Sequence, residues 1–164
     1  MNTHLSRQLL PEFEIESAKT HRLFEALPEG QNVFRTNAKS MPLARLAGHI
    51  TDLYRVIALS LTSPDLDWAN WSPYTMTTKM DLLTTLEENS QSALYALQNA
   101  SDEVFNQQWR IFRGEIDLFR GERYTAYRSN GMNQIVHHRA QLGGYIRALD
   151  LPLPGMYGPS ADGI

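Results

Sequence analysis

Apolar residues recur at intervals of three and four along four long stretches of this chain, the spacing of helices that each bury one face. The stretches cover about 9–27, 43–61, 79–99 and 122–149. Proline and glycine end the first at Pro28 and Gly30, and Pro152 and Pro154 end the last. Four such helices predict an all-α fold in which the buried faces meet in a helical bundle.

The helix ends and the connections carry their own signals. Pro11 predicts that the first helix becomes regular only after Leu10, and Ser40 is the expected N-cap of the second helix, with Pro42 near its first position. The stretch 62–74 combines prolines with aromatic residues and is expected to be an ordered loop that covers the core. The stretch 109–119 is either a short hairpin around Arg113-Gly114 or irregular extended chain.

The length, charge and composition of the chain exclude several classes of protein function. The 164 residues fit a single domain over 1–164. Fifteen basic against eighteen acidic residues, without a basic cluster, predict no nucleic-acid partner. No signal peptide and no apolar run of about 20 residues is present, which predicts no membrane partner and a cytoplasmic protein. The absence of cysteine excludes thiolate ligands and cysteine nucleophiles.

One histidine stands inside the apolar stripe of the last helix. Ile135, His138 and Leu142 follow at helical steps, so His138 occupies a position where leucine is usual. Gln134 and Gln141 flank the same face. A buried polar group without a partner costs about 1 to 3 kcal/mol. His138 is therefore either a hydrogen-bonded core residue or a ligand of a metal ion.

A second histidine lies at the edge of another stripe. His49 adjoins Leu46, Ile50 and Leu53 on the second helix and could meet His138 across the bundle. Two imidazoles from facing helices are a common start of a metal site, although a structural histidine is the alternative.

The other polar residues near this pair are weaker candidates for a metal site. Asp52 could orient the His49 imidazole or be a surface charge. His137 points about 100° away from His138 around the helix, while His4 and His21 are expected to be solvated. Sequence motifs of serine hydrolases and of phosphate-binding loops are absent.

Two segments resemble a known family, the DinB/YfiT-like proteins. The segment 133–142 (NQIVHHRAQL), which continues through 145–147 (YIR) and 154–162 (PGMYGPSAD), is similar to the C-terminal signature of that family. The segment 39–50 (KSMPLARLAGHI) resembles the start of the family's second helix. The resemblance implies an antiparallel four-helix bundle with up-down-down-up order, often a homodimer, in which three histidines bind nickel or zinc. The hairpin or irregular excursion would precede the last helix.

The resemblance implies a ligand set in which one residue has changed. His49 and His138 match two of the ligand positions, and the third, four residues before His138, is Gln134. An amide oxygen is a poorer ligand than imidazole for these ions, so the metal affinity should be below that of a three-histidine site.

Some members of this family transfer small thiols to electrophiles or isomerise thiol adducts, and the metal ion binds and acidifies the thiol. The resemblance therefore implies a metal-dependent transferase or hydrolase acting on a small thiol or another small molecule. The alternative is a metal-free helical bundle that acts as a binding or stress-related interaction protein.

Overall fold

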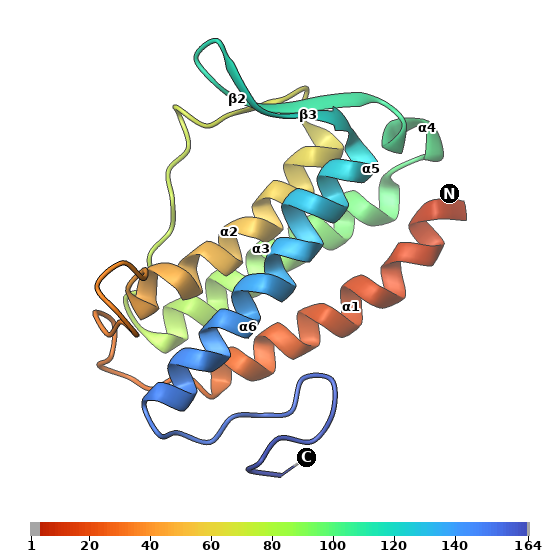
Figure 1. Cartoon of the computed structure of the whole chain (residues 1–164). Helices are drawn as coiled ribbons and strands as arrows, with labels where there is room; N and C mark the ends of the chain where they lie inside the picture. The colour runs from red at the N-terminus through yellow and green to blue at the C-terminus, as the bar shows by residue number, and fades with distance from the viewer. Residues whose placement is uncertain (1–3, 164) are drawn as a thin grey trace.

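The computed structural model describes residues 4–163. Four long helices lie side by side (Figure 1): α1 (His4–Glu25), α2 (Leu43–Thr62), α3 (Lys79–Asn99) and α6 (Asn133–Ala148). The shorter elements are β1 (Leu66–Asp67), α4 (Asp102–Phe105), β2 (Gln108–Arg113), β3 (Ile116–Glu122), α5 (Arg123–Thr125) and the π-helix η1 (Ala126–Met132). The chain is mostly helical with a small three-stranded sheet, so the prediction of a purely all-α fold was wrong in that respect.

Hydrogen bonds between the helix ends define the order of the bundle. The Leu5 amide donates to Asp102 Oδ1, which brings the start of α1 to the end of α3. The Met76 amide donates to the Ala44 carbonyl, so α2 and α3 begin at the same end and run in the same direction. The connection between them returns along the length of the bundle (Figure 1). This is the up-down-down-up order that the sequence resemblance implies.

The predicted stripes of α1 and α2 form the core. All their members are buried: Leu9, Phe13, Thr20, Leu23, Phe24 and Leu27 in and just after α1, and Leu43, Leu46, Ile50, Leu53, Ile57 and Leu61 in α2. In α3, Leu82, Leu86 and Leu97 are buried in the core, and Leu83 packs against it partly buried. The periodic spacing therefore identified most of the buried faces correctly.

Two predicted helix starts were wrong. Helix α1 begins by His4 and continues through Pro11, which is exposed, so the Arg7 carbonyl that loses its amide donor lies on an exposed part of the helix. The N-cap of α2 is Pro42 and not Ser40. The Ser40 hydroxyl lies 3.1 Å from the Thr36 hydroxyl in the preceding connection instead.

The hairpin alternative for residues 109–119 is confirmed. Strands β2 and β3 pair in antiparallel fashion around Gly114, whose φ of 60° suits a residue without a Cβ atom, and β1 pairs with β2 in parallel. Trp109 and Ile111 of β2 are buried against α2 and η1 in a second, smaller core. The predicted aromatic cover lies over this second core, because Trp68 and Trp71 stack at 5.4 Å and pack against it.

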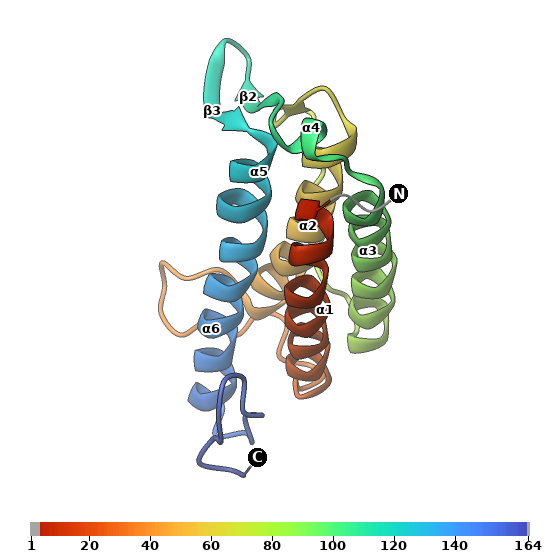
Figure 2. The same cartoon turned by 90° about the vertical axis from the view of Figure 1, so that its right-hand side faces the viewer.

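The last predicted helix is divided into three parts. Short α5 leads into η1, and α6 follows without a break in direction (Figure 2). A Cβ atom on Gly131 of η1 would lie 2.4 Å from Ile57 Cγ1, so the wide turn and a glycine together allow α2 to approach closely. No helix within residues 4–163 has the length and apolar content needed to cross a membrane.

Candidate metal site

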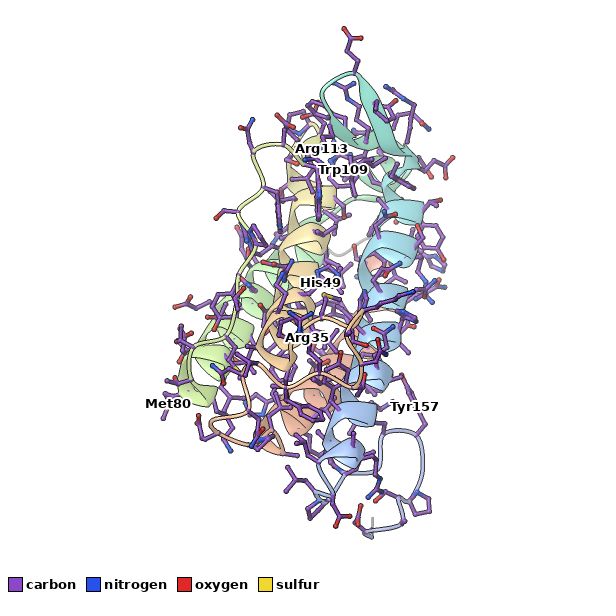
Figure 3. All side chains as sticks on the ribbon, turned by 60° about the vertical axis from the view of Figure 1, so that its left-hand side comes forward. Arg35, His49, Met80, Trp109, Arg113 and Tyr157 are labelled. Carbon is purple, nitrogen blue, oxygen red and sulfur yellow. The ribbon has the colours of Figure 1, made fainter. Side chains whose placement is uncertain are left out.

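The two predicted histidines meet between α2 and α6. The ring centroids of His49 and His138 lie 4.6 Å apart with the ring planes at 74°. Figure 3 shows His49 in the first half of α2, on the side of the bundle that carries α6. Both side chains are half-buried, so the prediction that His138 occupies the buried stripe was wrong. The pair lies at the rim of the core, where solvent can reach it.

Gln141 determines the orientation of the His138 ring. Its Oε1 lies 2.8 Å from His138 Nδ1, and its Nε2 lies 3.0 Å from His137 Nε2. With Gln141 Oε1 as the acceptor of this hydrogen bond, the neutral His138 ring carries its proton on Nδ1 and has an unprotonated Nε2. Sequence reasoning placed Gln141 beside His138 but missed this role, although the spacing of three residues on one helix is the signal for such a contact.

The protonation states suit metal binding. Burial, with the charges of His138 and Arg45, lowers the pKa of His49 to about 4. Burial and the charge of His137 also lower the pKa of His138, against the opposite effect of the Gln141 hydrogen bond. Both imidazoles are therefore neutral near pH 7, which is the form that binds metal ions or accepts a proton.

The third predicted residue lies on the same helix but is not joined to the pair. Gln134 is exposed, one turn before His138, and no hydrogen bond within residues 4–163 links its amide to either imidazole. Over the same residues, no three His, Cys, Asp or Glu side chains are placed to hold a metal ion together. The donors present fit an open, weak divalent site completed by water, and they do not fit a closed structural zinc site.

Comparison with known proteins gives the fold. No protein-family model and no curated protein matches this chain. The chain is similar in structure to the DinB-like protein YjoA from Bacillus subtilis: the match covers 91% of this chain and 97% of that one, with 19% sequence identity and a TM-score of 0.72. A DinB-like protein from Bacillus cereus also matches 91% of this chain, with 95% of its own chain covered, 18% sequence identity and a TM-score of 0.71. This chain has the DinB-like fold.

Within this DinB-like fold, the functional assignment has to come from the side chains, because fold similarity at such low identity does not carry an activity. The sequence allowed two roles for Asp52: to orient the His49 imidazole, or to be a surface charge. The structure shows neither role. Asp52 is 2% exposed and accepts hydrogen bonds from Arg55 Nη1 at 3.0 Å and from the Tyr74 amide at 3.1 Å. Burial raises the pKa of Asp52, and these two hydrogen bonds oppose that rise.

Asp52 instead holds the long connection between α2 and α3, which crosses the bundle and contains Tyr74, against α2 near His49. Gly48 contributes to the same contact, since a Cβ atom there would lie 2.4 Å from the Tyr74 carbonyl oxygen. Only glycine allows the backbone around Tyr74 to pass α2 this closely, one residue before His49. These contacts hold the part of α2 that carries His49 against the connection to α3.

A buried ion pair next to His138 was missed by sequence reasoning. Arg139 is 2% exposed and pairs with the Glu16 carboxylate of α1. Its Nη1 also donates to the Glu16 carbonyl at 2.8 Å and to Thr20 Oγ1 at 3.3 Å. The buried stripe of the last helix thus includes Arg139 where His138 was predicted, because Glu16 compensates the buried charge.

The chain beyond α6 completes this network. The Tyr157 hydroxyl accepts from Arg139 Nη2 at 2.7 Å and donates to Glu16 Oε2 at 2.6 Å. Lys19 Nζ donates to Glu16 Oε1 at 2.8 Å and lies 3.6 Å from the Tyr157 ring centroid. Burial raises the pKa of Glu16, but the hydrogen bonds from Lys19, Tyr157 and Arg139 outweigh it and hold this pKa below its ordinary value. The network fastens the C-terminal segment to α1 and fixes the helix that carries His138.

Proposed function

We propose that this protein binds a divalent metal ion, nickel or zinc, through His49 and His138 and acts on a small thiol or another small molecule. The observation that carries the proposal is the pair of neutral imidazoles at 4.6 Å, with His138 Nε2 left unprotonated by the Gln141 hydrogen bond. The DinB-like fold supports it, because the antiparallel packing of α2 and α6 presents both rings at the rim of the core.

Each residue has a defined part in this proposal. His138 would bind through Nε2, and Gln141 would hold its ring in place through the hydrogen bond to Nδ1. His49 would supply the second imidazole and Gln134 a weak amide oxygen from one turn earlier, with water in the open positions. A divalent ion held there would lower the pKa of a bound thiol and so supply a nucleophile near neutral pH. The thiol would come from the substrate, because the chain has no cysteine.

Isothermal titration of metal-stripped protein with nickel or zinc tests the proposal. We expect binding by the wild type that is lost in His138→Ala. His21→Ala is the matched control, since His21 lies on α1 beside Glu25, 3.6 Å from its carboxylate, and away from the pair. This variant should bind as the wild type does. Absence of binding by the wild type would contradict the proposal and favour a metal-free bundle that acts through binding partners.

A further inference from the structure

A pocket of about 520 Å³ opens next to the histidine pair. It lies between the connection from α1 to α2 and the second half of α6, and Figures 2 and 3 show this connection projecting beside α6. Its walls combine apolar and polar side chains. The lining residues are Thr36, Lys39, Ser40, Met41, Leu46, Gln141, Gly144 and Tyr145.

The pocket and the histidine pair share a wall. Gln141 lines the pocket and at the same time contacts His138 Nδ1 at 2.8 Å. Leu46 lines it from α2, three residues before His49, which is about one helical turn or 5 Å along the axis. Neither imidazole lines the pocket itself, but Gln141 and Leu46 place its inner wall next to both of them.

The charge of the lining points to an anionic ligand. Lys39 is the one charged side chain among the lining residues, and none of them is a carboxylate. Across residues 4–163, no Asp or Glu lies within ion-pair distance of Lys39 Nζ. Arg35 lies at the same connection and donates from Nη1 to the Ser40 carbonyl at 2.7 Å. This local excess of positive charge occurs in a chain whose net charge is −3.

Hydroxyl groups add neutral donors beside the ammonium group. Thr36 Oγ1 and Ser40 Oγ lie 3.1 Å apart, so one hydroxyl donates to the other and the second remains able to donate to a ligand. Met41, Leu46 and the Tyr145 ring offer apolar contact on the inner side. An ammonium group, a hydroxyl donor and an apolar wall suit a small organic acid.

We propose that this pocket binds the carboxylate end of a small substrate, held by Lys39 Nζ and the hydroxyls of Thr36 and Ser40, with the reactive end of the molecule turned toward His49 and His138. The assignment of the occupant as a substrate rests on the proposed function. The binding of the carboxylate does not, because it involves none of the metal-binding residues.

Two variants change the pocket in different ways. Lys39→Met removes the charge and keeps a side chain of similar length. Gly144→Leu keeps the charge and fills the space, because a Cβ atom built on Gly144 meets no heavy atom within 4 Å. Arg113→Met is the matched control, since it removes one exposed positive charge at the hairpin, away from Arg35 and the connection that borders the pocket (Figure 3).

The test is a titration of metal-free protein with succinate, and separately with its uncharged analogue succinamide, followed by ¹H–¹⁵N correlation spectra. We expect succinate to shift the amides of Lys39, Ser40 and Gly144 with a Kd of about 1 mM or tighter, and succinamide to leave them in place. Lys39→Met and Gly144→Leu should each weaken binding about tenfold or more, and Arg113→Met should bind as the wild type does. No saturable shift at these amides, or affinity unchanged in both pocket variants, would overturn the proposal.

The same titration on His49→Ala separates this inference from the proposed function. Succinate binding should persist in this variant even though metal binding is lost. Succinate binding without metal binding in the wild type would remove the metal proposal and keep the pocket. Metal binding without succinate binding would overturn the pocket proposal and keep the metal proposal.

Discussion

At the scale of single residues, the decisive difference is between His138 and Arg139. Both fit a helical stripe with Ile135 and Leu142, because steps of three and four are equally helical. Sequence reasoning placed the imidazole in the core, where the structure has the guanidinium. The choice depends on Glu16, which lies 123 residues earlier and compensates the charge. A partner so distant in the chain leaves no local signal, whereas the meeting of His49 with His138 follows from two stripes on facing helices.

We expect Arg139→Met to lower the free energy of unfolding by about 3 to 5 kcal/mol, because the Glu16 carboxylate would stay buried without its main partner. Urea unfolding followed by circular dichroism measures this change. The exposed control Arg113→Met should stay within about 0.5 kcal/mol of the wild type. A loss below about 1 kcal/mol in Arg139→Met would show that the pair contributes little.

The lowered pKa of Glu16 predicts a pH dependence. A carboxyl whose pKa is lower in the folded state stabilises the fold above its unfolded pKa of about 4.3, and this stability is lost as the pH falls toward the pKa of the folded state. Tyr157→Phe removes one hydrogen bond to the carboxylate and should cost about 1 to 2 kcal/mol at pH 7 and less at pH 3.

Urea unfolding at both pH values measures this difference. Tyr95→Phe, at a position that is 70% exposed, is the control and should show no such dependence. An equal loss at pH 7 and pH 3 in Tyr157→Phe would mean that the hydrogen bond does not act through the ionised Glu16.

Gln134→His restores an imidazole at the third predicted ligand position. We expect stronger nickel and zinc binding, because imidazole is a better ligand for these ions than an amide oxygen. Isothermal titration compares the variant with the wild type, and Gln134→Ala shows what the amide itself contributes. If histidine at position 134 gives no gain, this position does not face the ion and the site consists of two imidazoles and water.

At the scale of elements, the long helices could be predicted and the irregular ones could not. Apolar spacing gave the extents of α2 and α3 closely, because a whole buried face repeats over five turns. The π-helix η1 has no spacing of its own that sequence reasoning could detect. Its wide turn is associated with the packing of Gly131 against Ile57 of α2. Strand β3 is mostly exposed, so it has no buried face whose alternation could distinguish it from extended chain.

Two glycines in the last helical stretch predict opposite results on substitution by alanine. Gly131→Ala would place a Cβ atom 2.4 Å from Ile57 Cγ1 and should destabilise the protein by about 1 to 3 kcal/mol. Gly144→Ala meets no neighbour and should stabilise α6 by about 0.5 to 1 kcal/mol. Urea unfolding of both variants measures the two changes. Equal effects would mean that η1 does not pack tightly on α2.

At the scale of the whole molecule, the residues predicted a helical bundle, and the order of its helices came from the family resemblance. That order depends on contacts of the crossing segment, such as the Tyr74 amide with Asp52 and the Met76 amide with the Ala44 carbonyl, which no helical spacing encodes. Of the predicted ligand set, His49 and His138 are brought together and Gln134 stays apart. The homodimer implied by the resemblance stays a prediction, and the molar mass in solution, against 18.7 kDa for one chain, tests it.

The central claim is that His49 and His138 bind one divalent ion. Crystals soaked in zinc, with diffraction measured on both sides of the zinc absorption edge, test it most directly. We predict an anomalous peak between the two rings, about 2.1 Å from His138 Nε2 and from a nitrogen of His49. A peak at other histidines alone, such as His4 or His137, or no peak at all, would contradict the account.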